Sequence, residues 1–309
     1  MLEKKNNTAI AGGLLLTVIL WGGNNAGTKW LVSPALGAWP PIWTGGTRFL
    51  VAGAILLAVL RFTKLLGEFK PIERGLWPQL WLRGGLGLAA YILPFCWALH
   101  LTAASHVALY LGASPIWALL AEERPRRSLV SVRRYTAALL ALGGVVVLFW
   151  PALQNGKSDL LGEFMGLTAS IMWANYSWQA RFLSQKIPGV EVAAHSMWMS
   201  GVWLVPLGLI EVGRQGLLVD APHLGVQALC ILFGGVVPYA LWNSALRHWR
   251  TSQVMLFNNF IPLTTAVWVH YALHEPITPT FCAAMILICA GVLVGQVDWA
   301  KFFKLPESF

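Results

Sequence analysis

The placement of lysine and arginine between the hydrophobic stretches constrains this sequence more than any other feature. When the 309 residues are divided into ten membrane-spanning helices with the N-terminus inside, 18 of the 22 Lys and Arg residues lie at cytoplasmic ends or loops. Only Lys157 and Arg214 lie in outside loops, and Lys29 and Arg48 lie within spans. Basic residues kept on the cytoplasmic side are the main determinant of helix orientation. The pattern predicts an integral membrane protein with both termini in the cytoplasm.

Composition excludes several other classes of protein. Apolar residues make up 57% of the chain and charged residues 11%, against about 25% charged in soluble domains. Ten helices of about 20 residues each use some two-thirds of the chain, which leaves no room for a soluble domain. The net charge of +9 is spread over loops that face lipid headgroups, so we expect membrane lipid and not nucleic acid as a partner. All four cysteines fall inside predicted spans without CxxC spacing, so we expect no disulfide framework, no metal and no cofactor.

The ten predicted spans follow from the hydrophobic stretches. They cover residues 8–32, 40–61, 79–100, 104–121, 132–150, 161–183, 190–212, 223–246, 252–273 and 279–299.

The two halves of the chain resemble each other. The stretch around Trp21 aligns with the stretch around Trp173 at a spacing of 152, and residues 98–115 align with 245–262 at a spacing of 147. Each half contains five spans, and because five is odd, the second half must enter the membrane from the opposite side. Inverted repeats of this kind are typical of secondary transporters, whose site lies between the repeats. We therefore expect an all-α integral membrane fold of ten transmembrane helices, as two inverted five-helix repeats (1–150 and 151–309) around a central cavity.

A few of these features also carry a resemblance to a known family. Trp21 in the first span, the ALHLTAAS segment that leads into the fourth and the mid-helix Pro115 resemble the ten-helix exporters of the drug/metabolite transporter superfamily, which have paired EamA-type repeats. Glu123 and Glu275 stand where that family usually has a Glu, after the fourth and ninth helices. The abundance of Trp and Tyr is most similar to the bacterial aromatic amino acid exporters. The resemblance implies a multi-pass transporter in the bacterial inner membrane, and we expect it to act as a monomer.

Aromatic residues inside the spans are candidates for the substrate site. An indole or phenol in hydrocarbon needs a polar partner, so such side chains tend to face a polar interior. They form either a cavity wall for an apolar or aromatic substrate or ordinary contacts between helices. The equivalent positions of Trp21 and Trp173 in the two halves favour the central axis. The candidates are Trp21, Tyr91, Tyr110, Trp173, Tyr176, Tyr239 and Trp242.

Polar residues in the spans form a second group of candidates. Asn24, Asn25, Asn258 and His106 can offer hydrogen bonds to a zwitterion or simply bridge helices. Arg48 is the only strong charge deep in a span, and an intramembrane charge suggests a functional site. We expect Arg48 either to bind a substrate carboxylate or to have a structural or gating role by capping freed carbonyls.

Prolines and carboxylates bear on the mechanism. Pro115 and Pro262 occupy equivalent positions within helices, where proline removes a backbone donor, and we predict that they act as paired gate hinges. All thirteen Asp and Glu residues lie in loops or at span ends, whereas proton-driven pumps usually hold one within the membrane. We therefore predict facilitated transport.

The sequence thus favours export of amino acids, aromatic or large and apolar, by alternating access. A drug or other small metabolite is the alternative substrate on the same fold. Gly112-Ala113-Ser114 resembles the nucleophile segment of intramembrane serine proteases, but catalysis also needs a histidine within hydrogen-bond reach. We expect the protein not to be an enzyme.

Overall fold

The computed structural model describes residues 2–63, 66, 72–122, 129–155 and 157–296, and these residues form helices and no strand. They make ten long helical runs, which coincide with the ten predicted spans and extend several of them. Glu123, the basic residues Arg124, Arg126 and Arg127, and the end of the tenth predicted span lie outside the described residues.

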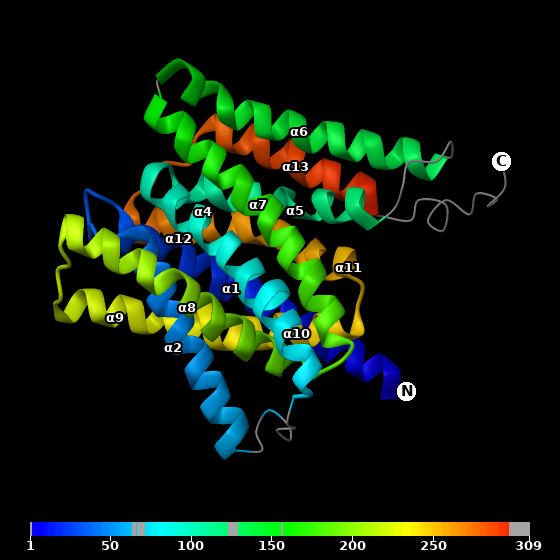
Figure 1. Cartoon of the computed structure of the whole chain (residues 1–309). Helices are drawn as coiled ribbons and strands as arrows, with labels where there is room; N and C mark the ends of the chain where they lie inside the picture. Colours follow the sequence, from blue (N-terminus) through cyan, green and yellow to red (C-terminus); the bar gives the residue numbers. More distant parts are fainter. Residues whose placement is uncertain (1, 64–65, 67–71, 123–128, 156, 297–309) are drawn as a thin grey trace.

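Seven of the runs are single helices (Figure 1). They are α1 (Leu2–Val32), α2 (Pro41–Phe62), α5 (Ala104–Glu122), α6 (Leu129–Asn155), α7 (Lys157–Ser184), α8 (Gly189–Gln215) and α13 (Pro279–Gln296).

Three runs are built from shorter segments. The third consists of η1 (Arg74–Leu76), α3 (Trp77–Gln79), the π-helical η2 (Leu80–Leu86) and α4 (Gly87–Leu101). The eighth consists of α9 (Ala221–Leu229), the π-helical η3 (Cys230–Val236) and α10 (Val237–His248). The ninth consists of α11 (Thr251–Met255), the 3-10 helix η4 (Leu256–Phe260) and α12 (Ile261–Leu273).

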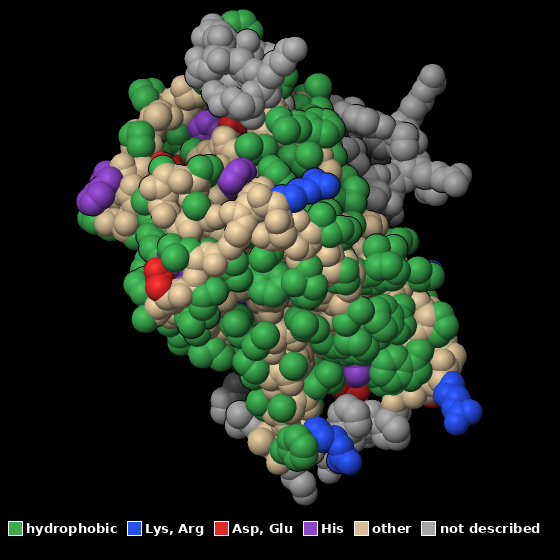
Figure 2. Space-filling view, turned by 60° about the vertical axis from the view of Figure 1, so that its left-hand side comes forward, with side chains coloured by type: hydrophobic (Ala, Val, Ile, Leu, Met, Phe, Trp, Pro, Cys, Tyr) green, Lys and Arg blue, Asp and Glu red, His purple; other side chains and the backbone are tan. Residues whose placement is uncertain are grey.

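The helices have the length and surface of membrane spans. Among the described residues, five segments are long and apolar enough on their own to cross a membrane, namely Asn7–Val32, Pro41–Phe62, Arg74–Leu101, Gly189–Gln215 and Ala221–His248. Shorter apolar helices lie at Leu139–Leu148 and Pro279–Gly291. Figure 2 shows that hydrophobic side chains cover most of one face of the molecule. Large hydrophobic side chains such as Leu139 and Trp178 are exposed, as a lipid-facing surface requires.

Helix contacts follow the inverted repeat. The second run packs against the seventh (α2 with α8), and the fifth packs against the tenth (α6 with α13), so each of these helices lies beside its counterpart from the other half (Figure 1). The contacts of α7 with α4 and α5 correspond to the contacts of α1 with α10 and α12. This arrangement confirms the expected fold of ten helices in two inverted five-helix repeats.

Two basic side chains show the same symmetry in atomic detail. On α1, Lys29 Nζ donates to the carbonyls of Leu99 (2.9 Å) and Thr102 (2.8 Å), at the end of α4. On α7, Arg181 Nη1 donates to the carbonyls of Leu246 (3.0 Å) and Trp249, at the end of α10. Acceptors in the two halves are 147 residues apart and donors 152 apart, the same spacings that align the sequence. The two contacts lie at opposite ends of the bundle, and we call them the Lys29 latch and the Arg181 latch.

Candidate functional site

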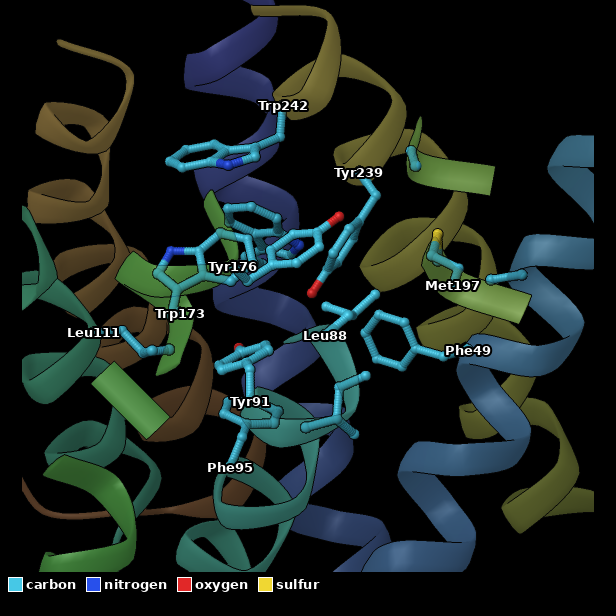
Figure 3. Close-up of a cluster of buried hydrophobic side chains, with 14 of the residues drawn as sticks. Phe49, Leu88, Tyr91, Phe95, Leu111, Trp173, Tyr176, Met197, Tyr239 and Trp242 are labelled. Carbon is cyan, nitrogen blue, oxygen red and sulfur yellow. The ribbon is translucent and has the colours of Figure 1, made fainter. Parts of the chain in front are cut away.

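Six aromatic side chains meet in the middle of the bundle, and we call them the aromatic cluster. Figure 3 labels five of them. Trp21 on α1 and its repeat counterpart Trp173 on α7 touch edge to face, with ring centroids 5.2 Å apart. Because counterparts that touch must lie beside the pseudo-two-fold axis, the cluster lies where the two repeats meet. Its members are Trp21, Tyr91, Trp173, Tyr176, Tyr239 and Trp242.

The rings hold one another at contact distances typical of aromatic packing. Trp173 lies 4.9 Å from Tyr91, 5.6 Å from Tyr176 and 5.4 Å from Trp242, measured between ring centroids. Trp21 lies 5.6 Å from Tyr239 and 5.0 Å from Trp242. Ring pairs at these distances attract beyond their buried area by about 1 kcal/mol each. The ring contacts therefore stabilise the aromatic cluster as a unit.

A small cavity of about 20 Å³ opens between these rings and the helices around them. This is room for a water molecule or so and not for an amino acid, so the conformation described here is closed around its site. Seven of the predicted site residues line the cavity, namely Trp21, Asn24, Asn25, Arg48, Tyr91, Trp173 and Tyr239. The lining is completed by Phe49, Phe95, Leu111, Gly234 and Ile261.

Backbone chemistry positions Trp21 against η3. Pro238 has no N–H to return to the carbonyl of Gly234 four residues earlier. The indole Nε1 of Trp21 donates to that carbonyl at 3.0 Å. The same glycine lets α1 approach, because a Cβ at residue 234 would lie only 1.9 Å from Asn24 Oδ1. A Gly followed four residues later by Pro was the available signal in the sequence, and our prediction missed it.

The other side of the cavity is polar. The Arg48 side chain on α2 is 1% exposed, and its Nη1 donates to Thr28 Oγ1 (2.5 Å) and Asn24 Oδ1 (3.1 Å) on α1. Asn25 donates through Nδ2 to Thr265 Oγ1 on α12 at 3.0 Å. The cavity thus has an aromatic side and a polar side whose only charge, among the lining residues, is a guanidinium.

Three further predicted residues lie near the cavity without lining it. Tyr176 and Trp242 pack behind Trp173. Asn258 on η4 donates through Nδ2 to Ser114 Oγ on α5 at 2.8 Å, so its amide joins two helices.

The predicted hinges lie on two helices, α5 and α12, that contact each other in this region. Pro115 lies within α5, whereas Pro262 is the second residue of α12 and follows the 3-10 segment η4. The two halves therefore differ here, because the break in the ninth run comes before its proline. Pro262 packs on Gly112, where a Cβ would lie 2.9 Å from the proline Cγ.

His106 and Tyr110 belong to a separate polar cluster, which we call the Glu163 cluster. Glu163 on α7 is 2% exposed and accepts hydrogen bonds from Tyr110 OH (2.5 Å) and Thr102 Oγ1 (2.5 Å). His106 Nδ1 lies 2.8 Å from the same carboxylate. His106 and Tyr110 are four residues apart and so share one face of α5, and both side chains contact α7 and not the cavity. Sequence reasoning missed Glu163 because its position at a span end suggested a solvated carboxylate.

Glu275, which follows the ninth run, has a capping role. Its carboxylate accepts from the backbone N–H groups of Ala104 (3.2 Å) and Ser105 (3.1 Å) and from the Ser105 hydroxyl. These are N–H groups at the start of α5 that have no partner within the helix, and a carboxylate there is favoured by the helix dipole.

Comparisons with known proteins agree with this architecture. A sequence model described as the EamA-like transporter family matches residues 9–150 and 160–295. A solved crystal structure superposes with a TM-score of 0.65 at 18% identity, over 94% of this chain and 97% of that chain, which shows a shared fold.

Relatives among curated proteins are distant but cover nearly the whole chain. A Salmonella typhimurium protein named "Probable amino-acid metabolite efflux pump" is 24% identical, covering 91% of this chain and 92% of its own length. A "Probable terminal-alkyne amino-acid exporter" of Streptantibioticus cattleyicolor is 24% identical and covers 91% of both chains. An "Uncharacterized transporter" of Archaeoglobus fulgidus is 23% identical over 90% of this chain and 94% of its own.

Proposed function

This chain belongs to the EamA-like transporter family, and from that premise we propose that it exports amino acids, with a preference for aromatic or large apolar ones. The observation that carries the preference is the aromatic cluster, four of whose rings (Trp21, Tyr91, Trp173 and Tyr239) line the small cavity on the axis between the two repeats. Two relatives whose names mention amino-acid efflux or export support the general class of substrate. A drug or other small metabolite is the alternative substrate on the same fold.

The proposed binding set consists of the seven candidate residues that line the cavity, in direct contact with substrate. Tyr176, Trp242 and Asn258 support them from nearby, whereas His106 and Tyr110 belong to the Glu163 cluster. Transport would proceed by alternating access, as the repeats (1–150 and 151–309) rock about Pro115 and Pro262 and open the cavity to one side at a time. The charge pattern supports a bacterial inner-membrane protein with both termini in the cytoplasm, and we propose that it acts as a monomer.

We further propose that transport is facilitated and needs no proton gradient. The described residues that line the cavity include no Asp, Glu or His that could relay a proton there. A solute that leaves down its own gradient requires none.

Flux into proteoliposomes tests this proposal. Purified protein is reconstituted, and uptake of labelled tryptophan, phenylalanine, leucine and glutamate is measured with and without an imposed pH gradient. We expect saturable flux of tryptophan or phenylalanine without the gradient. Flux of none of the four would contradict an amino acid exporter, and flux only with the gradient would contradict facilitated transport.

Two tryptophans on α7 provide a matched pair of variants. Trp173 is buried in the aromatic cluster, whereas Trp178 is 50% exposed on the same helix. We expect Trp173→Ala to lower tryptophan flux at least about tenfold. The variant loses several ring contacts, which together contribute more than about 1.4 kcal/mol, the free energy that corresponds to a tenfold change in affinity. Trp178→Ala should transport as wild type does.

A further inference from the structure

Arg48 is a buried cation whose hydrogen bonds are incomplete. Its Nη1 donates to two neutral acceptors, Thr28 and Asn24, while its Nε–H has no hydrogen-bond partner although the atom is buried. No described carboxylate forms a salt bridge with it. The guanidinium is therefore held in place by the protein but left without a counter-ion at the wall of the cavity.

Such an arrangement is costly, because a buried charge normally needs a paired charge or a full set of hydrogen bonds. The chain meets this need elsewhere with its own acceptors. In the Lys29 latch and the Arg181 latch, each cation donates to two backbone carbonyls at the end of a helix. Arg48 differs from both because it faces the cavity and keeps a free donor. The described residues therefore leave the charge of Arg48 without a paired charge, and a carboxylate bound in the cavity would supply one.

We propose that Arg48 is the receptor for the carboxylate of the transported amino acid. This inference rests on the proposed function and adds to it the chemical group that every substrate must carry. A guanidinium matches a carboxylate with two parallel N–H donors in a plane, and charge-assisted bonds of this kind are the strongest that a side chain makes. Thr28 and Asn24 act as positioning residues, since they fix the plane of the guanidinium from the side of α1.

The surroundings of Arg48 set the direction of approach. Phe49 covers one face of the guanidinium, with Arg48 Cζ 5.1 Å from the ring centroid, so an anion meets it edge-on. Trp21, Trp173 and Tyr239 also line the cavity. The amino acid therefore binds with its carboxylate toward α2 and its side chain between the rings. An amine without a carboxylate would bring a second positive charge beside Arg48 and leave the Nε–H bare.

Ligand pairs that differ only in the carboxylate test the proposal. Binding to the purified wild-type protein is measured by isothermal titration calorimetry for tryptophan, tryptamine and indole-3-propionate, and for leucine against isoamylamine. We expect tryptophan to bind at least about 30-fold more tightly than tryptamine, the size of a lost partner in a buried charged pair. Indole-3-propionate, which keeps the carboxylate and lacks the ammonium, should also bind more tightly than tryptamine.

Variants locate the effect. In Arg48→Gln, the affinities for tryptophan and tryptamine should converge to within about threefold, because the charge that separates them is gone. Arg48→Lys keeps the charge without the planar fork, so it should keep the preference with a weaker affinity for tryptophan. Arg83→Gln is the matched control, since it removes a guanidinium that lies outside the cavity, over the ring of Phe182, and should leave the preference unchanged.

The outcomes separate this inference from the proposed function. Equal binding of tryptophan and tryptamine to wild type overturns it, and so does an Arg48→Gln variant that keeps the preference or a folded wild type that binds no carboxylate ligand. If Arg48→Gln does not fold, the wild-type pairs and Arg48→Lys still decide. If leucine binds better than isoamylamine while no indole compound binds, the result supports carboxylate binding by Arg48 and contradicts the preference for aromatic amino acids.

Discussion

At the scale of the residue, Gly234 contributes to both parts of the site without a side chain. Its carbonyl accepts from Trp21, and its missing Cβ leaves space for Asn24, which in turn holds Arg48. One glycine therefore links the aromatic and the polar sides of the cavity. Only the packing of η3 against α1 shows this, because a glycine within an apolar stretch of sequence is ordinary.

We expect Gly234→Ala to destabilise the protein by about 2 kcal/mol and to lower transport strongly, because the new methyl group must push Asn24 away from Arg48. The measurement is the melting temperature of the detergent-purified protein together with tryptophan flux. Gly225→Ala in α9 is the control, since a Cβ there meets no atom within 4 Å. Similar losses in both variants would show that the effect is one of helix backbone and not of the cavity.

At the scale of the element, the Glu163 cluster joins α5 to α7. Two of its donors, Tyr110 and Thr102, belong to α5 or the turn before it, and the carboxylate belongs to α7. The sequence indicated the shared face of His106 and Tyr110 through their spacing, but it could not indicate the partner, because that depends on which helix packs there. The same limit applies to η2 and η3, whose π-helical turns have no clear signature in the sequence.

Glu163→Gln should destabilise the fold by about 2 kcal/mol, because an amide replaces a buried carboxylate that accepts charge-assisted hydrogen bonds. Tyr110→Phe removes one of these bonds and should cost less, about 1 kcal/mol. Both values can be measured by reversible unfolding in mixed micelles. Equal stability of Glu163→Gln and wild type would mean that the cluster does not hold α5 to α7.

At the scale of the whole molecule, the inverted repeat was predictable and the closed state was not. The alternation of basic residues and the spacings of 152 and 147 are long-range regularities that survive in a single sequence. These spacings favoured a place near the central axis for Trp21 and Trp173, and the structure shows the two rings in contact. How far the two halves close on the cavity depends on contacts such as the Lys29 latch and the Arg181 latch, which join residues far apart in the chain.

The two latches should control opposite ends of the bundle. We expect Lys29→Met to favour opening at the predicted outer end and Arg181→Met at the predicted inner end, because each loses the contacts that tie two helices there. A cysteine at the cavity residue Leu111, in a protein without its four native cysteines, reports opening through its rate of labelling by an impermeant maleimide. Lys29→Met should label faster from outside and Arg181→Met faster from inside. Faster labelling of both variants from the same side would contradict this assignment.

The closed cavity has a consequence for the concentration at which such a carrier works. The protein's own rings already fill most of the space, so an incoming ring replaces contacts that exist instead of adding new ones. The net gain on binding is then small, while the loss of freedom on association is not. Such a carrier is half-saturated only when its ligand is abundant. Under the proposed function, such a transporter would drain a surplus of amino acid and leave a scarce pool to biosynthesis.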